Sequence, residues 1–537
     1  LFRSEVLRTP PAPLPVLLDR LATEFSYPPE TISRAKNEPL VLASHTSRNP
    51  IPHLTRHLPP GTRTSIDATL QGRSGTILRE ELARLSAKNV QQGALVVLDN
   101  RSGEILALHG SPDFSSSNGG QINGALSPRS AGSTLKPFTY ALAFENQHLF
   151  PGTIIPDIPT DYRTAEGLDA PRNFDRRHRG PVSIREALAT SLNIPAMRML
   201  NQVGGPEVLH QLLTTLGLDL PKPASEYGLG LTIGNAEVSL LSLTNAFATL
   251  ARLDTHLPPS FSHPSSSSPT TLLSPETCYL LADILADNAS RTPAFGPQSP
   301  LRLPFPCAVK TGTSSDFRDN WCLGFTRDFT VGVWVGNFDN SPMTGVSGID
   351  GAGPIFHRLM MVLHEDRAAA FPPQPENLTS LVVDERTGHH YPVPPPPHTP
   401  WQRSELCRQS HLPLVVSPSD YDQQNRALLS SEYHDWYHSP ENAKSHAFAL
   451  TPFKPISVLS LQSLTPLPDA TYYLDPELPG STTQLKLQAN LDQVSWVSPS
   501  LKIQNNTATL TPGTHQLTLT HPPTGQSLTC RIIVEEL

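Results

Sequence analysis

The sequence predicts an α+β domain with one antiparallel sheet, followed by a small all-β sandwich module. Strand patterns at residues 93–111 are followed by helical periods from 130 to about 250, and strand patterns return after residue 306. This order is typical of an antiparallel sheet whose helices are grouped together. Short alternating strands over 451–537 predict the second module. More than one domain also fits the length, because 537 residues are too many for a single core.

The composition excludes several classes of protein. The formal net charge is −8 and no basic patch is present, so nucleic-acid binding is not indicated. No apolar stretch approaches the roughly 20 residues that span a bilayer, and no signal-peptide pattern occurs. The chain begins with Leu1 rather than Met. We therefore expect any export signal or membrane anchor of the native protein to precede Leu1.

The cysteines favour neither a disulfide framework nor a zinc site. Their number is odd, their spacing is wide, and the chain has no CxxC pair and no HExxH motif. Cys307 and Cys322 could face each other across a hairpin, but we favour the interpretation that all the cysteines are small buried apolar residues. They are Cys278, Cys307, Cys322, Cys407 and Cys530.

The first elements along the chain are a weak helix and a hairpin. Residues 1–60 are rich in proline and include a short helical pattern, PETISRAKNEPLVLA, that is too small for a core of its own. GALVVLDNRSGEILALHGS at 93–111 predicts two strands around an Asn-Arg-Ser-Gly turn. Three helical periods follow, namely SIREALATSLNIPAMRMLNQVG, PEVLHQLLTTLG and AEVSLLSLTNAFATLARL. The last alternates small and apolar residues, which is typical of a buried helix.

The second half of the chain returns to strands. A low-complexity loop at 255–271 and a helix near 275–288 precede CAVKTGTS, NWCLGFTRD and FTVGVWVGNF, which predict three strands. YPVPPPPHTPW at 391–401 predicts a stiff proline-rich connection. Weak patterning on both sides extends this predicted linker over 376–450.

Ser133 and Lys136 form an S-x-x-K motif just before an apolar run. Residues three apart share a helix face, and Pro137 fits only in a first helical turn, so both should lie at the start of a helix. Serine is a poor nucleophile until a neighbouring base accepts its proton. A lysine can be that base only when it is neutral, which burial and the positive end of a helix favour. The amide of Ser133 would also be placed to hold an oxyanion.

Other copies of such short motifs occur in the chain. A second S-x-x-K, Ser33–Lys36, is interpreted as chance on a surface helix. The S-x-N triplets Ser47–Asn49 and Ser116–Asn118 lie in loop-like segments. Only Ser191–Asn193 lies between helical segments downstream of the candidate nucleophile, and a plain helix C-cap is its alternative interpretation.

KTGT, from Lys310 to Thr313, is placed on a predicted edge strand. Side chains alternate along a strand, so Lys310 and Thr313 share a face only if a twist or bulge near Gly312 brings them together. A K-T-G taken alone is usually a turn. The ordered set S-x-x-K, S-x-N, K-T-G is far more specific than any of its members.

These motifs resemble those of the penicillin-binding proteins, the serine acyltransferases that cross-link peptidoglycan. The resemblance extends to the blocks GSTLKPFTYALAFE, RGPVSIREALATSLNIPAM, GLGLTIGNAEVSLLSLTNAFATLA and VKTGTSSDFRDNWCLGFTRDFTVGVWVGNFD, which occur in family order. It covers residues 61 to about 370 and implies the serine penicillin-recognising transpeptidase/β-lactamase-like fold. The implied transpeptidase domain is 61–375.

The flanking segments resemble those of one subgroup, the class A enzymes. Residues 1–60, including SRAKNEPL, resemble the tail that follows a glycosyltransferase domain in these bifunctional proteins, and that domain is absent from this sequence. The β-sandwich module, 451–537, resembles the module that ends the 1C type. We expect this module either to bind cell-wall proteins or simply to stabilise the chain.

The resemblance assigns roles to the residues of the first two motifs. It implies that Ser133 is the acylated nucleophile and that Lys136 is the base that deprotonates it. Ser191 would relay a proton to the leaving amine, and Asn193 would hold the peptide backbone of the substrate.

The K-T-G segment is assigned in the same way. Lys310 would set the local electrostatic field and orient Ser191, while Thr311 and Thr313 would bind the substrate carboxylate on either side of Gly312. The amides of Ser133 and Thr313 would form the oxyanion hole. No cofactor or metal is implied, because this acyl transfer needs neither.

Several activities are compatible with such a site. The resemblance implies a D,D-transpeptidase that acts on stem peptides ending in D-Ala-D-Ala and is inhibited covalently by penicillin; with water as acceptor it would be a D,D-carboxypeptidase. A β-lactamase is disfavoured, because no E-x-x-L-N segment lies between Ser191 and Lys310. A β-lactam sensor or wall-bound scaffold remains an alternative. Because cross-links form outside the cytoplasmic membrane, we expect the protein at the periplasmic face of the inner membrane.

Overall fold

The computed structural model of the chain separates into two compact units, residues 1–177 with 181–415, and residues 178–180 with 416–537. Within the described ranges, no helix has the length and apolar character of a membrane span. The predicted N-terminal tail, 1–60, lies largely outside these ranges, as do most of Ser33–Lys36 and all of Ser47–Asn49. The structure describes residues 28–30, 33, 51–55, 58–59, 61–146, 148–164, 167–261, 270–396, 399–451, 461–474, 483–491, 493–523 and 525–536.

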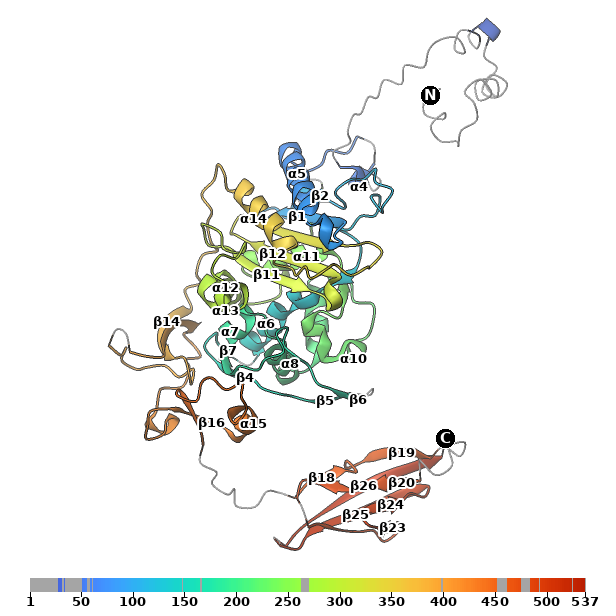
Figure 1. Cartoon of the computed structure of the whole chain (residues 1–537), viewed down its shortest axis with the longest axis vertical. Coiled ribbons are helices and arrows are strands. Elements are labelled where there is room, and N and C mark those ends of the chain that lie inside the picture. The colour runs from blue at the N-terminus through green and yellow to red at the C-terminus, as the bar shows by residue number, and fades with distance from the viewer. Residues whose placement is uncertain are drawn as a thin grey trace. The chain divides into compact units, whose positions relative to one another are not determined.

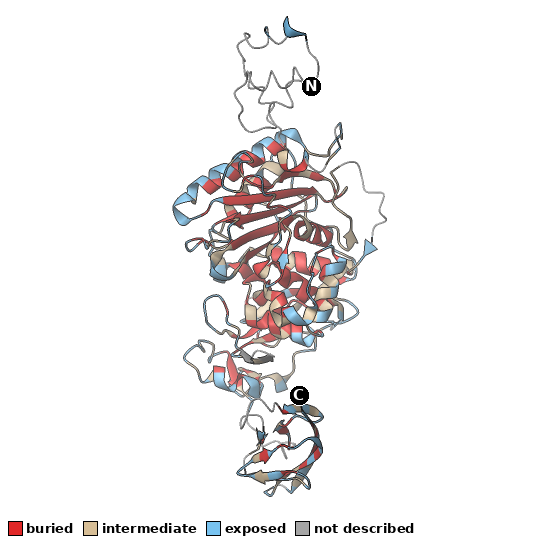
Figure 2. Cartoon of the chain, turned by 90° about the vertical axis from the view of Figure 1, so that its right-hand side faces the viewer, coloured by how far each residue is buried: buried red, intermediate tan, exposed pale blue. Residues whose placement is uncertain are grey.

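A five-stranded antiparallel sheet forms the centre of the first unit, in the order β11–β12–β13–β1–β2 (Figure 1). Strands β12 and β13 are buried along their whole length (Figure 2), because helices cover both faces of the sheet. The strand that carries K-T-G, β11, lies at one edge, as the sequence predicts. The strands are β1 (Gln92–Asp99), β2 (Ile105–His109), β11 (Ala308–Thr313), β12 (Asp319–Phe325) and β13 (Phe329–Gly336).

Two helices cover one face of the sheet. Valines of β1 and β13 pack there against Leu78 and Phe356 in a core of its own. Asp67 begins the first of these helices by accepting a hydrogen bond from the amide of Leu70, which satisfies a free N–H of the first turn. The helices are α5 (Ala68–Arg84) and α14 (Ala352–Leu363).

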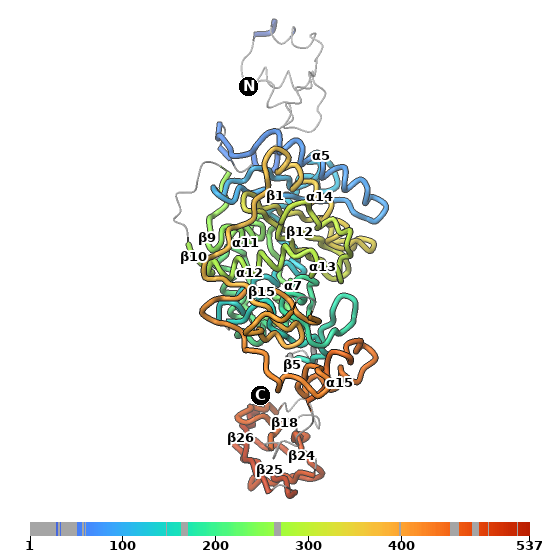
Figure 3. Tube along the Cα trace, turned by 90° about the vertical axis from the view of Figure 1, so that its left-hand side faces the viewer, coloured from blue at the N-terminus to red at the C-terminus, as the bar shows by residue number. Residues whose placement is uncertain are grey.

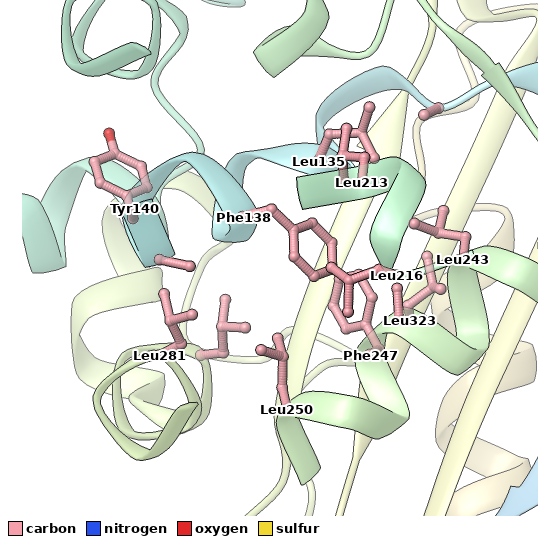
Figure 4. Close-up of a cluster of buried hydrophobic side chains, with 14 of the residues drawn as sticks. Leu135, Phe138, Tyr140, Leu213, Leu216, Leu243, Phe247, Leu250, Leu281 and Leu323 are labelled. Atoms are coloured by element: carbon pink, nitrogen blue, oxygen red, sulfur yellow. The ribbon is translucent and has the colours of Figure 1, made fainter. Parts of the chain in front are cut away.

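A group of helices covers the opposite face and holds the larger core. Phe138 meets Phe247 edge to face with ring centroids 5.7 Å apart, and Leu323 of β12 packs in the same cluster (Figure 4). The helical periods predicted between 183 and 288 are confirmed as helices here. These helices are α6 (Lys136–Asn146), α7 (Ile184–Ala189), α8 (Asn193–Gln202), α9 (Pro206–Thr215), α11 (Leu240–Ala251), α12 (Pro275–Ala286) and α13 (Asn288–Phe295).

Short elements complete this part of the chain. They connect the sheet and the helices and supply the turns on which the candidate residues lie. They are α4 (Pro52–Thr55), η1 (Ser86–Lys88), β3 (Arg129–Ser130), η2 (Gly132–Leu135), β4 (Ile154–Asp157), β5 (Tyr162–Thr164), β6 (Gly167–Asp169), β7 (Gly180–Ser183), α10 (Ala224–Tyr227), η3 (Gly228–Ile233), β8 (Glu237–Val238), β9 (Thr255–His256), β10 (Thr270–Thr271) and η4 (Ser315–Phe317).

Residues 376–415 differ from the predicted linker. They contain an antiparallel pair, β14 (Leu378–Asp384) and β15 (Gln402–Arg408), that belongs to the first unit. Strand β15 lies beside α12 (Figure 3). Val383 and Cys407 are buried with Phe150, and this apolar contact holds the strand pair on the domain.

In the second unit, the short strands and helices within 418–450 also differ from the predicted linker, and the predicted all-β module follows them. A four-stranded sheet, β19–β26–β25–β22, and a three-stranded sheet, β20–β24–β23, share one apolar core that includes Trp496, Leu517 and Ile532. The elements are η5 (Pro418–Asp420), β16 (Ala427–Leu429), η6 (Ser431–Tyr433), α15 (His434–Tyr437), β17 (Phe448–Leu450), β18 (Ser463–Thr465), β19 (Ala470–Leu474), β20 (Gln484–Lys486), β21 (Gln488–Ala489), β22 (Ser495–Val497), β23 (Lys502–Gln504), β24 (Thr507–Thr509), β25 (Gly513–His521) and β26 (Gln526–Glu536).

All five cysteines lie in the described residues, and each is a buried free thiol. Strand register places Cys322 opposite Thr311, so Cys307, which precedes β11, does not face it. The interpretation of the cysteines as small buried apolar residues is therefore confirmed.

Candidate active site

Ser133 and Lys136 lie at the start of a helix, as the position of Pro137 predicts. Ser133 is in the short helix η2, and Lys136 is the first residue of α6. The amide of Lys136 donates to the carbonyl of Ser133, which keeps the two residues on one turn. Ser133 is half-buried, whereas Lys136 is fully buried. The serine thus remains accessible to a substrate while the lysine is removed from water.

The surroundings of Lys136 favour its neutral form. Its Nζ lies 2.6 Å from the carbonyl oxygen of Ser191, 2.6 Å from Oδ1 of Asn193 and 3.3 Å from Oγ of Ser191. None of these acceptors is a carboxylate. Burial, reinforced by the positive charge of Lys310, holds the pKa of Lys136 well below its ordinary value. A lowered pKa makes the neutral amine, which can accept a proton, more accessible.

Ser191 occupies the turn between α7 and α8 with a left-handed backbone, φ 61°. Such a conformation is uncommon for a residue other than glycine and carries strain that clusters at functional sites. It allows both the carbonyl and the hydroxyl of Ser191 to accept from Lys136. The same hydroxyl accepts from Nζ of Lys310 at 2.8 Å, so one serine joins the two buried lysines.

Asn193 is held in one orientation by residues that the sequence did not single out. Its amide N–H donates to Oδ1 of Asn173 at 2.8 Å, and its Nδ2 donates to the carbonyl of Arg172 at 2.8 Å. With Nδ2 used in this way, Oδ1 is left to face Lys136. Asn173 is itself buried and donates to Asp157 at 2.7 Å. No local motif marks Asn173 or Asp157, because their contact forms only when β4 and the loop before β7 meet.

The K-T-G strand faces this cluster from the edge of the sheet. Lys310 is buried and also donates to the carbonyl of Thr311 at 2.8 Å. Burial lowers the pKa of Lys310 to about 7, and the charge of Arg291 acts in the same direction. The β11–β12 register continues unbroken through Thr313, so no bulge turns Thr313 toward the face of Lys310. Instead Oγ1 of Thr313 accepts from the amide of Gly348 at 2.9 Å.

Glycines allow the nucleophile turn and the K-T-G strand to touch through their backbones. A Cβ atom at Gly132, where φ is 57°, would lie 2.7 Å from the amide nitrogen of Thr313. A Cβ at Gly312 would lie 3.4 Å from the amide nitrogen of Ser133. On the other side of the turn, a Cβ at Gly234 would lie 1.5 Å from the carbonyl oxygen of Gly132. The segments that carry the amides of Ser133 and Thr313 are therefore in direct contact.

The three motifs thus converge on one cluster, and the other S-x-N triplet in the described chain does not join it. Ser116 and Asn118 lie in a turn, where the amide of Asn118 donates to Oγ of Ser116. A family model of the penicillin-binding protein transpeptidase domain matches residues 93–361, which contain the whole cluster. The chain belongs to the penicillin-binding protein transpeptidase family.

Known penicillin-binding proteins resemble this chain in sequence or in fold. Penicillin-binding protein 1C of Escherichia coli (strain K12) is 30% identical over 383 residues, which cover 68% of this chain and 47% of that relative. The crystal structure of penicillin-binding protein 1A from Haemophilus influenzae matches with a TM-score of 0.55 at 17% identity, covering 75% of this chain and 82% of that one. PonA1 from Mycobacterium tuberculosis, solved in complex with penicillin V, matches with a TM-score of 0.50 at 20% identity over 71% of this chain and 99% of that one. The chain spans about half the length of its Escherichia coli relative.

Proposed function

We propose that this penicillin-binding protein is a peptidoglycan D,D-transpeptidase that works through an acyl-enzyme on Ser133. The proposal rests on the surroundings of Lys136. The amine of this residue is fully buried, and its hydrogen-bond acceptors in the described chain include no carboxylate. Lys136 is the first residue of α6, three positions after Ser133, and its Nζ contacts Ser191 of the S-x-N turn. Lys310 of K-T-G also binds Ser191. A depressed lysine pKa beside a serine is the arrangement that activates a serine nucleophile.

In this proposal acylation proceeds in the following steps. Neutral Lys136 takes the proton of the Ser133 hydroxyl, and the serine oxygen attacks the penultimate D-alanine carbonyl of a stem peptide. The amides of Ser133 and Thr313 hold the resulting oxyanion. When the peptide C–N bond breaks, Ser191 gives its proton to the leaving D-alanine amine and is reprotonated by Lys136, whose Nζ lies 3.3 Å from its Oγ.

The remaining residues of the site bind and orient the substrate. The free edge of β11 offers backbone groups to an extended stem peptide, as an exposed sheet edge does in other peptide complexes. In this proposal Asn193 holds the substrate backbone, Thr311 and Thr313 bind its terminal carboxylate, and Lys310 orients Ser191. An amine of a neighbouring strand attacks the acyl-enzyme carbonyl and loses a proton to Lys136. The ester bond to Ser133 breaks, the Ser133 oxygen takes that proton back from Lys136, and the cross-linked peptide leaves.

The substrate implies where and with what the protein works. Stem peptides ending in D-Ala-D-Ala are cross-linked outside the cytoplasmic membrane, so we place this site at the periplasmic face of the inner membrane. β-Lactams, as mimics of the D-Ala-D-Ala end, are its second class of ligand. The β-sandwich module at 451–537 is proposed to bind cell-wall proteins.

Intact mass after incubation with excess penicillin tests this proposal. We expect the wild type to gain the mass of one penicillin and Ser133→Ala to gain none, with equal thermal unfolding of the two proteins. An unmodified wild type with intact drug would favour a scaffold. An unmodified wild type with hydrolysed drug would contradict the proposal and indicate a β-lactamase. Turnover of a D-Ala-D-Ala peptide with and without an acceptor amine then separates transpeptidase, carboxypeptidase and sensor.

A further inference from the structure

The chain passes from the first unit into the second at residue 178 and returns to the first after residue 180. Residues 178–180 belong to the second unit, although the first unit contains 1–177 and 181–415 on either side of them. This short segment follows the loop that carries Asn173 and leads through β7 and α7 to Ser191 of the S-x-N turn. Contacts that hold the segment therefore act on two stretches of chain that carry groups of the site.

The second unit holds this segment mainly through its backbone. The amide N–H of His178 donates to Oε2 of Glu441 at 3.0 Å, and Nδ1 of His178 lies 2.8 Å from the same oxygen. The indole Nε1 of Trp436 donates to the carbonyl of His178 at 3.1 Å. Trp436 is buried, and a Cβ atom at Gly180 would overlap its ring. Side chains from 436–441 thus fix both polar backbone groups of His178 and the position of Gly180.

The other side of the same peptide group is bonded by Asn173. The carbonyl of Arg177, which shares a peptide group with the amide of His178, accepts from Nδ2 of Asn173 at 2.8 Å. A peptide group is planar, so a contact that fixes the direction of its N–H also fixes the direction of its carbonyl. Glu441 and Asn173 therefore hold opposite sides of one rigid group.

Asn173 passes this constraint on to the site because both ends of its amide are used. Its Nδ2 also donates to Asp157, and its Oδ1 accepts from the amide N–H of Asn193 at 2.8 Å. A flipped side chain would place its NH₂ group against that N–H and leave buried groups unpaired, which is costly. Asn193 in turn presents its Oδ1 to Nζ of Lys136 at 2.6 Å. Hydrogen bonds joined by one peptide group and two amide side chains thus lead from Glu441 to the buried lysine.

We propose that Glu441 and Trp436 are positioning residues for the acyl transfer. They fix the backbone of 177–180 and, through it, the side chains of Asn173 and Asn193. This inference rests on the proposed function, since it concerns the same active site. Loss of either contact frees Asn193 to turn and slows acylation, although no reacting group is changed. The segment that precedes the β-sandwich module would then be part of the support of the site.

The rate of acylation by penicillin tests this role in the full chain. Glu441→Ala removes the acceptor for the His178 amide, and we expect acylation to slow about fivefold, as for the loss of one ordinary hydrogen bond. Glu441→Gln keeps an acceptor oxygen and should restore the rate to within about twofold of the wild type. Trp436→Phe keeps a ring but removes the N–H, and should also slow acylation about fivefold. Asp435→Ala is the matched control, because it removes an almost fully exposed side chain of the same helix, α15, and should leave the rate unchanged.

A double mutant separates positioning from a general loss of stability. In an Asn173→Ala background the contact of Glu441 no longer reaches Asn193, so adding Glu441→Ala should slow acylation by less than about twofold. A further fivefold loss in that background, or an equal loss in Asp435→Ala, would overturn the inference. Glu441 is exposed at the surface, so its variants decide the matter even if Trp436→Phe fails to fold.

Hydrogen exchange separates this inference from the proposed function. The amides of Asn193 and Ile194 donate to Oδ1 of Asn173 at 2.8 and 3.4 Å, so their exchange reports its orientation. We expect mass spectrometry to show about fivefold faster exchange at these amides in Glu441→Ala and none in Asp435→Ala. If penicillin does not acylate the wild type but this difference is present, the proposed function fails and the positioning of Asn173 stands. Equal exchange in the wild type and Glu441→Ala would overturn the inference.

Discussion

Arg185 and the lysine pair Lys136–Lys310 are both buried in the first unit, but they differ in their partners. Arg185 of α7 is buried among acidic groups: Glu405 accepts from its Nε and Nη2, Asp283 accepts from its Nη2 at 2.6 Å, and Asp287 lies 3.4 Å from its Nη1. Lys136 and Lys310 are buried to the same degree, but their hydrogen-bond acceptors in the described chain are carbonyl, amide and hydroxyl oxygens.

This difference gives the two clusters opposite acid–base behaviour. Burial alone works against the charge of Arg185, but Glu405 and Asp283 raise its pKa above the ordinary value. Burial and like charge instead lower the pKa of Lys136. The arginine is thereby kept charged and joins α7, α12 and β15, whereas the lysine can lose and regain a proton. In the proposed mechanism, the absence of a carboxylate partner is what allows Lys136 to exchange a proton.

The largest effect is expected when Lys136 is made permanently charged. Lys136→Arg keeps a cation of similar length, but guanidinium does not deprotonate in proteins, so Ser133 loses its base. We expect acylation by penicillin to slow about 10⁴-fold, at the upper end for loss of a general base. Stopped-flow acylation measures it, with the exposed Lys88→Arg as control. A rate within tenfold of the wild type would contradict the assignment of Lys136 as base.

The reciprocal change removes the structural cation. Arg185→Met leaves Glu405 buried without its main partner, and breaking one side of a buried ion pair costs roughly 3–5 kcal/mol. We therefore expect a loss of about 4 kcal/mol in the free energy of unfolding, measured by urea denaturation. The acylation rate per folded molecule should stay within twofold of the wild type. A large loss of acylation at full stability would show that this cluster, too, serves catalysis.

Asn173 orients Asn193, a hydrogen-bond partner of Lys136, and is itself buried. Its removal therefore tests how much the orientation of that partner contributes to acylation. Asn173→Ala removes the acceptor for the amide of Asn193, so the partner of Lys136 loses its orientation. We expect acylation to slow about 30-fold, equivalent to roughly 2 kcal/mol. Asn100→Ala is the matched control, because Asn100 is equally buried and donates to the carbonyl of Thr326 far from the motifs in sequence. It should lower the melting temperature by a similar amount and leave acylation unchanged.

The smallest effect is a displacement of the pH profile. The charge of Lys310 lowers the pKa of Lys136, so removing that charge in Lys310→Gln raises it. Because neutral Lys136 is the base, the acidic limb of the acylation profile should move to higher pH. Lys310→Arg keeps the charge and should leave the limb in place. An acidic limb that moves to lower pH in Lys310→Gln would mean that another group titrates there.

Sequence reasoning located the parts of the site that are contiguous in the chain. S-x-x-K, S-x-N and K-T-G each contain their chemistry within a few residues, and Pro137 marks the helix start that places Ser133 and Lys136. The roles of Thr311 and Thr313 in carboxylate binding stay predictions. The sequence could not show roles that depend on contacts between distant segments. Asn173, for example, orients Asn193 only because the fold brings Asp157 and Asn193 beside it.

The prediction of a linker was wrong at residues 376–415 for the same reason: the strands there depend on contacts with distant segments. The prolines of 391–401 dominate the local pattern and obscure the β-branched run LTSLVVD and its partner QRSELCR. These strands are stable because Val383 and Cys407 are buried and because Glu405 pairs with Arg185, 220 positions away. Local composition predicts how stiff a segment is in isolation, but burial against a distant helix decides whether it becomes a strand.

The contact of Gly234 with Gly132 has a consequence for the evolution of drug resistance. A bacterium escapes a β-lactam only through changes that slow acylation by the drug more than acylation by its own substrate. Any side chain at position 234 would meet the carbonyl oxygen of Gly132 and displace Ser133 for both alike. We therefore expect position 234 to be closed to adaptive change.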